Sequence, residues 1–491
     1  MKKLIPILTG IFLTITGFSQ SCLPEGIYFE TQAQIDSFQV NYPGCTQIEG
    51  DVIIYSQDEI SSLNGLSVLT SIGGNLEIGY NIGLTNLTGL DNLITIGGNL
   101  WIYANFELTS LSGLENLTSI GGELGIVANI LLTNIAELDN LDASSITNLF
   151  IYKNNSLSAC DSPLICNYLI SPNGTINIYL NGPGCNNPAE IANACGISLF
   201  CLPFGNYFFF TQTEVDSFQV NFPNCNQLEG DVIIGDDLVN NLNGLIHLSS
   251  IGGKLQIGEI PSSMVALTNL TGLDSLVIIG GDLIISNILH LDNISALGSL
   301  TNVTGDLFIR HNPSLQNLSG LENLNSIGGW LYLEWNNSLE SLAGLDNIAS
   351  ESIDILSIYR NHALSVCDVQ SICEHLADPN GSSHFEENAT GCNSTLEVEE
   401  ACAVNLTYNV IPDHQFSISP NPSSTRITIE TSAIPAKFQI SIFNLNGQEL
   451  ISQTVTDPVT VIDIDDLQPG VYFVRLTGKK IVGVEKFVKI D

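Results

Sequence analysis

Residues 84–105 read LTNLTGLDNLITIGGNLWIYAN and make up one unit of a repeat. Its Ile-Gly-Gly phrase begins at Ile72, Ile96 and Ile120, a strict period of 24 residues that is typical of a solenoid. Each unit also contains a short Leu-x-Ile strand. Because strand side chains alternate between two faces, the Leu and the Ile of each strand are expected to point inward. The period therefore predicts a stack of similar coils.

Glycine and asparagine mark the corners of each coil. The Gly-Gly pair is expected to form the tight corner that leads into the strand, where a Cβ atom would be costly. An asparagine follows most strands at a fixed offset, and we expect its amide to stack inside the turn and satisfy backbone groups. These asparagines are Asn81, Asn105, Asn129, Asn154, Asn312, Asn336 and Asn361.

The cysteines show that the coils occur in two copies. The first set is Cys22, Cys45, Cys160, Cys166, Cys185 and Cys195, and the second is Cys201, Cys225, Cys367, Cys373, Cys392 and Cys402. The spacings agree except for the central interval, which is longer in the second copy by about one coil, so we predict five strands in the first copy and six in the second. Six cysteines allow 15 pairings. We expect Cys22 to pair with Cys45 and Cys201 with Cys225, with the remaining cysteines closing a cap in each copy.

The N-terminus has the features of a secretory signal peptide. Lys2 and Lys3 precede a short apolar run and the polar residues Ser19, Gln20 and Ser21. No later segment reaches about 18 consecutive apolar residues, so we expect no transmembrane span. Lipidation at Cys22 is the alternative, but its counterpart Cys201 is internal and the preceding residues form a poor lipidation motif.

The two copies are strongly acidic. Outside the signal peptide and the last 76 residues, Lys153, Lys254, Arg310 and Arg360 stand against 43 acidic residues, a net charge of −39. This charge argues against nucleic acid or anionic lipid as a partner, and we interpret it as favouring solubility outside the cell. Binding of divalent cations is the alternative interpretation, but the sequence lacks the Asp-rich loop that calcium sites use.

A different module begins at Phe416, because residues 416–491 contain no cysteine and are nearly neutral. Alternating strand patterns predict a small β-sandwich. Four motifs resemble the type IX secretion sorting domain of Bacteroidota: Ser419-Pro-Asn-Pro422, the turn at Asn446-Gly-Gln448, Pro469-Gly-Val-Tyr-Phe473 and the basic terminal strand. The resemblance implies contact with the type IX machinery and export through the periplasm to the outside or the cell surface. An ordinary adhesive sandwich is the alternative.

The Gly-x-Leu-x-Ile-x-x-Asn unit, the leucines that follow and the cysteine caps resemble the receptor L domain, which occurs twice in the insulin and epidermal growth factor receptors. The cysteine-rich segment between the two domains of those receptors is missing here, since Cys195 and Cys201 are almost adjacent. We therefore expect a mainly β protein with two right-handed leucine-rich β-solenoids and a C-terminal β-sandwich. The expected parts are a signal peptide at 1–20, solenoids at 21–198 and 199–403, a linker at 404–415 and a sorting domain at 416–491.

The sequence contains no motif that points to an enzyme, a metal or a cofactor. All seven histidines lie in or after the second copy, and the positions that match them in the first copy are not histidine, so we expect loop or surface residues. His375 and His384 stand near several glutamates, but their spacing matches no zinc motif.

Aromatic residues occupy the outward positions of the predicted strands. Such side chains dominate the energies of interfaces, although they also pack against one another along a sheet. The candidates are Tyr55, Trp101, Tyr103, Phe150 and Tyr152 in the first copy and Phe308, Arg310, Trp330, Tyr332 and Tyr359 in the second. We expect a non-enzymatic surface or secreted protein that captures glycan or peptide ligands. A structural spacer without a specific ligand is the alternative.

Overall fold

A computed structural model describes residues 20–490 except 57–59, 236–237, 259–265, 380, 409–415, 432–437, 445–447, 456 and 479–480. The predicted signal peptide, apart from Gln20, and the Asn446-Gly447 turn lie outside the described residues. The chain divides into two compact units, Met1–Val404 and Asn405–Asp491.

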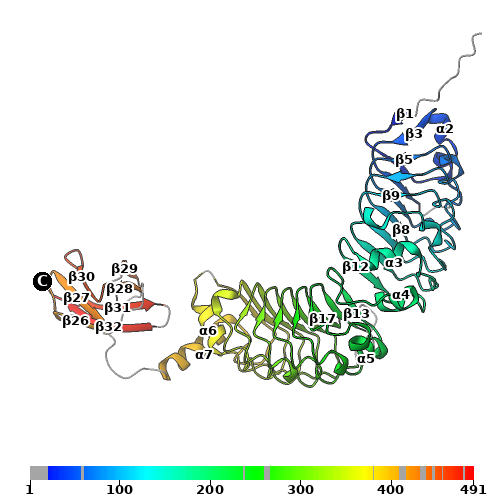
Figure 1. Cartoon of the computed structure of the whole chain (residues 1–491). Helices are drawn as coiled ribbons and strands as arrows, with labels where there is room; N and C mark the ends of the chain where they lie inside the picture. The colour runs from blue at the N-terminus through cyan, green and yellow to red at the C-terminus, as the bar shows by residue number, and fades with distance from the viewer. Residues whose placement is uncertain are drawn as a thin grey trace, which may run out of the picture. The chain divides into compact units, whose positions relative to one another are not determined.

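The first copy is a stack of coils with a parallel sheet along each of two sides (Figure 1). The longer strands form a seven-stranded sheet: β2 (Ile27–Phe29), β4 (Val52–Tyr55), β6 (Leu76–Gly79), β8 (Leu100–Tyr103), β10 (Leu124–Val127), β11 (Leu149–Tyr152) and β12 (Ile176–Tyr179). Shorter strands form the other sheet: β1 (Gln20–Cys22), β3 (Cys45–Ile48), β5 (Ser71–Ile72), β7 (Thr95–Ile96) and β9 (Ser119–Ile120).

The second copy repeats this arrangement. Its longer strands form an eight-stranded parallel sheet: β13 (Tyr207–Phe209), β15 (Val232–Ile234), β17 (Leu255–Gly258), β19 (Leu283–Ser286), β21 (Leu307–Arg310), β23 (Trp330–Glu334), β24 (Ile355–Tyr359) and β25 (Ser382–Glu386). Its shorter strands are β14 (Gln227–Leu228), β16 (Ser250–Ile251), β18 (Ile278–Ile279), β20 (Asn302–Val303) and β22 (Ser326–Ile327). The sequence predictions of five and six strands missed the first and the last strand of each copy, β2, β12, β13 and β25.

Helices close the ends of both copies, and single 3-10 turns interrupt the loops. The N-terminal helices are α1 (Gln32–Asp36), α2 (Phe38–Asn41) and α5 (Gln212–Asn221), and the C-terminal helices are α3 (Pro163–Ile170), α4 (Pro188–Cys195), α6 (Gln370–Ala377) and α7 (Thr395–Tyr408). The 3-10 turns are η1 (Asn64–Leu66), η2 (Ala136–Leu138), η3 (Ala143–Ser145), η4 (Asn243–Leu245), η5 (Ser295–Leu297) and η6 (Ser350–Ser352). Helix α7 covers the first residues of the segment that we predicted as a linker.

One hydrophobic core runs through both copies. The inward residues of each long strand are fully buried, as Leu100 and Ile102 illustrate, and buried residues from Phe29 to Cys402 form a single cluster. Burying one such aliphatic side chain contributes about 1.5–3 kcal/mol. Because every coil is too thin to bury these side chains alone, each coil depends on its neighbours for stability.

The Gly-Gly corners are set by close contact between coils. A Cβ atom at Gly97 would lie 2.1 Å from the carbonyl oxygen of Gly73, and one at Gly98 would lie 2.3 Å from Asn75 Oδ1. The pair is therefore required because the preceding coil leaves no space for a side chain.

A ladder of buried asparagines joins the coils of the first copy. In Asn81, Asn105, Asn129 and Asn154, the backbone N–H donates to the side-chain oxygen of the next asparagine, at 2.9–3.1 Å. Each side-chain amide also donates to a backbone carbonyl of the preceding coil, as Asn154 Nδ2 does to Ile126 O at 2.8 Å. The predicted stacking is confirmed. The ladder also includes Asn181 in the cap.

The second copy has the same ladder. It runs from Asn312 through Asn336 and Asn361 to Asn388, with N–H to Oδ1 distances of 3.2, 2.9 and 3.0 Å. Asn388 was missed from the sequence, as Asn181 was, because each follows a cap strand that lacks the Gly-Gly-x-Leu pattern.

Many acidic residues have fixed hydrogen-bonding roles in the coils. Asp91 Oδ2 accepts from the backbone N–H of Gly89 at 2.7 Å, and Glu115 Oε2 accepts from Gly113 at 2.8 Å. Both glycines have a positive φ of about 110°, which favours glycine. The acidic character of the solenoid is therefore partly structural, in addition to any effect on solubility.

All twelve cysteines are paired. The pairs are Cys22–Cys45, Cys160–Cys185 and Cys166–Cys195 in the first copy and Cys201–Cys225, Cys367–Cys392 and Cys373–Cys402 in the second. The two expected N-terminal pairs are confirmed, and the structure resolves the pairing within each cap. The disulfide at Cys22 also occupies the thiol that lipidation would require.

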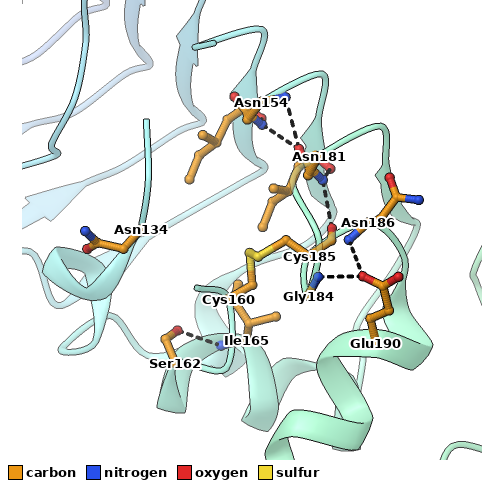
Figure 2. Close-up of a disulfide and its surroundings, with 12 residues drawn as sticks. Asn134, Asn154, Cys160, Ser162, Ile165, Asn181, Gly184, Cys185, Asn186 and Glu190 are labelled. Carbon is orange, nitrogen blue, oxygen red and sulfur yellow. Dashed lines mark hydrogen bonds between the residues drawn. A yellow bond between two sulfur atoms is a disulfide. The ribbon is translucent and has the colours of Figure 1, made fainter. Parts of the chain in front are cut away.

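The cap of the first copy ends the asparagine ladder (Figure 2). Asn181 Nδ2 donates to Cys185 O at 3.0 Å, and Cys185 is fixed to Cys160 by a disulfide. Glu190 of α4 accepts from the backbone N–H groups of Gly184 and Asn186 at 2.8 and 3.0 Å. The cap thus supplies partners to the polar groups that would otherwise be left at the end of the stack.

The C-terminal unit is a β-sandwich of two antiparallel sheets. One contains β26 (Phe416–Ser419), β27 (Arg426–Thr431) and β30 (Val459–Asp463), and the other β29 (Glu449–Val455), β28 (Phe438–Phe443), β31 (Gly470–Gly478) and β32 (Ile481–Lys489). Buried residues such as Ile427, Val474 and Phe487 form its separate core. Asn421, from the Ser-Pro-Asn-Pro motif, bonds to β32 through Lys486 O and Val488 N at 3.0 and 2.9 Å. The motif therefore holds the terminal strand in place.

We predict that Asn154→Ala destabilises the first copy by about 3 kcal/mol, because it removes the side-chain partners of the buried Asn129 N–H and Ile126 carbonyl groups. The neighbouring Asn155 is exposed, so Asn155→Ala is expected to change stability by less than about 0.5 kcal/mol. Urea unfolding followed by circular dichroism measures both variants. Equal stability of the two would show that the ladder contributes little.

Candidate ligand-binding face

The outward side chains of the two long sheets form three columns. Parallel pairing in register places equivalent residues of successive strands side by side. Column A contains Trp101 and the residues that pair with its position in the other strands, and column B contains Tyr103 and the residues that pair with its position; in β23 these are Tyr332 and Glu334. Column C contains the next residue, which has a positive φ, as Ala104 does at 52°.

Five predicted candidates of the first copy lie on this face. Trp101 and Phe150 are in column A, and Tyr55, Tyr103 and Tyr152 are in column B, all partly exposed. Their rings contact neighbouring rings. Tyr55 lies 5.3 Å from Tyr80, Tyr80 lies 5.8 Å from Tyr103, and Trp101 stacks on Phe150 at 5.3 Å.

Two glycines give these rings their positions. A Cβ atom at Gly79 would lie 2.4 Å from the Tyr103 ring, and one at Gly125 would lie 2.1 Å from the Trp101 ring. Tyr103 therefore lies across the preceding strand, and Trp101 lies across the following one. The sequence pattern already contained this signal, since a glycine in an outward strand position often marks close packing by a neighbour.

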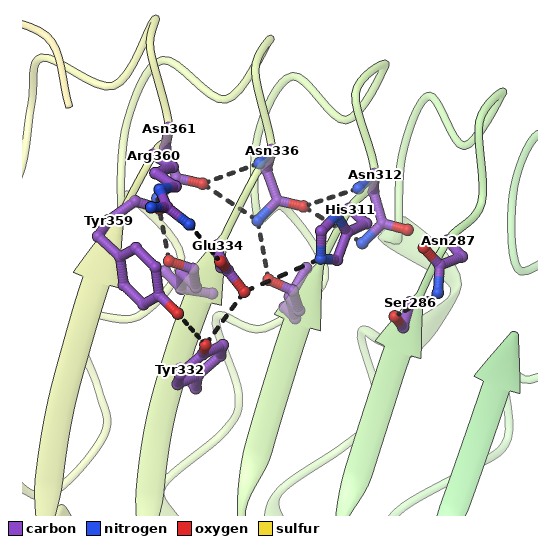
Figure 3. Close-up of polar contacts among 12 residues, drawn as sticks. Ser286, Asn287, His311, Asn312, Tyr332, Glu334, Asn336, Tyr359, Arg360 and Asn361 are labelled. Atoms are coloured by element: carbon purple, nitrogen blue, oxygen red, sulfur yellow. Dashed lines mark hydrogen bonds and ion pairs between the residues drawn. The ribbon is translucent and has the colours of Figure 1, made fainter. Parts of the chain in front are cut away.

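The second copy has a network of polar side chains on the outward face of its long sheet (Figure 3). Glu334, in column B, is only 8 % exposed. Its carboxylate accepts from the Tyr332 hydroxyl at 3.0 Å and lies 3.6 Å from Arg360 Nη1 and 3.9 Å from His311 Nε2. Tyr332 also shares a short hydrogen bond with Tyr359. These contacts fix Tyr332 and Tyr359, which we predicted, around Glu334, which we did not.

The network changes the acid–base properties of its members. Burial raises the pKa of Tyr332 first, and hydrogen bonds to Tyr359 and Glu334 raise it further. The hydrogen bond to Glu387 raises the pKa of Arg360. Both shifts move the pKa values further above the neutral range.

The other predicted residues of the second copy have different surroundings. Arg310 lies over the Phe308 ring, with its guanidinium carbon 5.6 Å from the ring centroid. Trp330 begins β23 and is 43 % exposed, and its backbone N–H donates to Asp306 Oδ1 at 2.7 Å. Trp330 is thus on the outward face but at the opposite end of the strand from the network.

Sequence reasoning missed a group of rings where the two copies meet. Tyr179 stacks on Tyr152 at 4.7 Å and on Phe208 at 3.9 Å, and Phe210 lies 5.7 Å from Tyr179. Tyr179 and Phe208 belong to β12 and β13, the strands that the Gly-Gly pattern did not mark. The sequences Ile176-Asn-Ile-Tyr and Tyr207-Phe-Phe alternate inward and outward residues, and this alternation could have identified both strands.

The expectation for the histidines was partly wrong. His375 is 3 % exposed in α6, and its Nε2 lies 3.2 Å from Ser382 O, because it occupies the core position that Tyr168 fills in the first copy. His384 is exposed beside Glu386, as predicted for surface residues. Across the described residues, no group of three His, Cys, Asp or Glu side chains is arranged to hold a metal ion.

Comparison with known families agrees with this architecture. Residues 44–168 and 277–399 match the receptor L domain family, with one match in each copy, and together they cover about half of the chain. Residues 417–490 match the secretion system C-terminal sorting domain. No curated protein matches the chain.

We predict that the protein loses stability between about pH 10 and pH 12, partly through Tyr179. Burial, and then Tyr152, raise the pKa of Tyr179 from 10.0 to about 12. The folded protein therefore holds this proton more tightly than the unfolded chain does, and the resulting stability is present below pH 10 and lost as the pH rises toward 12. Thermal unfolding across this range should show a smaller alkaline loss in Tyr179→Phe than in the unchanged protein. An identical loss would contradict the prediction.

Proposed function

We propose, from the premise that this chain belongs to the receptor L domain family, that it is a binding protein that captures glycan or peptide ligands in adhesion. Its outward sheet faces are the proposed binding surface.

The C-terminal sorting domain directs the chain through type IX secretion to the cell surface or the extracellular space. The described residues include no helix long and apolar enough to cross a bilayer. Six disulfides fit a protein that folds in an oxidising compartment and acts outside the cell.

The observation that carries the proposal is the set of partly exposed aromatic side chains on the outward faces of both copies. Trp101, Tyr103 and Tyr152 in the first copy and Trp330 and Tyr332 in the second lie on a rigid scaffold. Aromatic side chains held in place lose little conformational entropy when they bind, so such residues contribute strongly to interfaces. Their fixed positions support recognition of a ligand.

The proposal includes that the chain is not an enzyme. The most chemically varied group on the face is the Glu334 network, and its carboxylate is already engaged by Tyr332 and Arg360. A catalytic carboxylate must instead reach a substrate proton or atom. The network supports the scaffold and the shape of the face.

A structural spacer is the second candidate function. The observation that favours it is that most outward rings contact one another, as Trp101 and Phe150 do, while one core continues through both copies. In that case the rings would stabilise a stiff rod and recognise nothing.

We predict that the purified chain without its signal peptide binds specific probes on glycan and protein arrays. A variant with Trp101, Tyr103, Trp330 and Tyr332 changed to alanine should lose at least about tenfold in affinity, because hot-spot side chains each contribute more than about 1 kcal/mol. Circular dichroism checks that this variant remains folded.

The matched control changes Ile94 and Ile278 to alanine, since these exposed side chains belong to the opposite side of the coils. It should bind as the unchanged protein does. A folded aromatic variant that keeps full binding would argue against the outward face, and the absence of any specific ligand would favour the spacer.

A further inference from the structure

The two copies meet without an intervening segment. The backbone N–H of Ile176, in β12, donates to Phe204 O at 3.2 Å, and Asn206 N donates to Ile176 O at 3.2 Å. Asn186 Nδ2, from the first cap, donates to Glu214 Oε1, in α5 of the second copy, at 2.6 Å. The outward faces therefore continue from one copy to the next.

The strand register slips by two residues at this junction. Within the second copy, the first inward residues of neighbouring strands pair with each other, as Tyr207 does with Val232. At the junction, the inward residue Ile176 instead bridges to Gly205, two residues before Tyr207. The slip brings column B of the first copy beside column A of the second. This is why Tyr179 stacks on Phe208.

The slip also creates a patch of rings and amides. Along residues 204–209 exposure alternates, with Phe204, Asn206 and Phe208 outward and Tyr207 and Phe209 buried. Asn206 Nδ2 donates to Asn177 Oδ1 on β12 at 2.8 Å, and Asn206 Oδ1 accepts from the backbone N–H of Asp231 at 2.7 Å, so Asn206 holds Asn177 in place. We define the junction patch as Asn177, Tyr179, Phe204, Asn206 and Phe208. Phe204 is its most exposed ring, at 50 %.

The junction patch contains no charged side chain, although the solenoid around it carries a net charge of −39. The exposed Lys153 follows Tyr152 on the neighbouring strand, and its backbone N–H donates to Tyr179 O. An anionic ligand would be repelled by the solenoid as a whole, and a cationic ligand would gain no carboxylate within the patch.

A peptide ligand is also disfavoured at this place. Extended peptides commonly bind by adding a strand to an exposed sheet edge, which requires unpaired backbone groups. Here β12 and the segment before β13 already bond to each other across the junction. What the patch offers is ring surface next to side-chain amides, which suits the apolar faces and hydroxyl groups of a sugar.

We infer that the junction patch binds an uncharged polysaccharide chain that lies across both copies. This inference rests on the proposed binding function and assigns it a ligand class and a place. Phe204 stacks on a sugar ring, and the side-chain amide of Asn177, positioned by Asn206, bonds to its hydroxyl groups.

The test is affinity gel electrophoresis of the full chain without its signal peptide. The gels contain hydroxyethyl cellulose, amylopectin or mannan as uncharged probes and polygalacturonate as the anionic probe. We expect at least one uncharged probe to retard the protein. Phe204→Ala should weaken that binding by about tenfold, as expected for a lost stacking contact, while Phe204→Tyr should retain it.

The matched control is Phe106→Ala, which removes a ring that is 40 % exposed on the loop after β8 and outside the junction patch. It should bind normally. Retardation by polygalacturonate alone, or by no uncharged probe, overturns the inference, as does uncharged binding that Phe204→Ala leaves unchanged. The proposed binding function is tested separately by the glycan and protein arrays. A specific ligand on the arrays would support that function even if the junction patch binds no polysaccharide, and the absence of any ligand on the arrays would contradict it.

Discussion

The structure depends on the buried amide bonds that join each coil to the next. From Asn105 to Asn154 in the first copy, each ladder asparagine accepts a hydrogen bond from the preceding asparagine and donates to the following one, so a coil is complete only within the stack. A displaced coil would leave these groups unpaired in an apolar interior, which costs far more than an exposed contact. The ladder thereby fixes the register of the strands, and the register fixes the three outward columns. The outward side chains are therefore carried by strands whose register is fixed.

The two copies use this shared scaffold differently. In the first copy, glycine in column A or B makes room for a neighbouring ring, so Tyr103 and Trp101 lie across adjacent strands. In the second copy, Glu334 gathers polar side chains into a network. Duplication has therefore preserved the coil positions that build the core and the ladder, while the outward positions have diverged. The acidic residues that bond to turn glycines belong to the preserved part.

The sequence predicted the features that repeat. Leucines, Gly-Gly corners and asparagines recur with a fixed period, so the solenoid, its duplication and the ladder could be inferred without a structure. It did not predict the first and last strands of each copy, because Tyr207–Phe209 and Ile176–Tyr179 lack the Gly-Gly signal. The junction patch also escaped prediction, since it results from a register slip between two strands that are distant from any repeat motif. The contacts of Glu334 depend on side-chain directions that a linear pattern does not contain.

The last strand of each copy occupies the same place in the fold but has a different neighbour. On β12, Asn177 and Tyr179 face outward, and another coil follows. On β25, which ends its sheet among the described residues, the corresponding positions hold His384 and Glu386, with 55 % and 64 % of their side chains exposed. Charged groups on a terminal strand discourage pairing with a strand from another molecule. The first copy thus ends by pairing with the second, whereas the second copy ends in an edge strand whose exposed Glu386 carboxylate disfavours pairing between molecules.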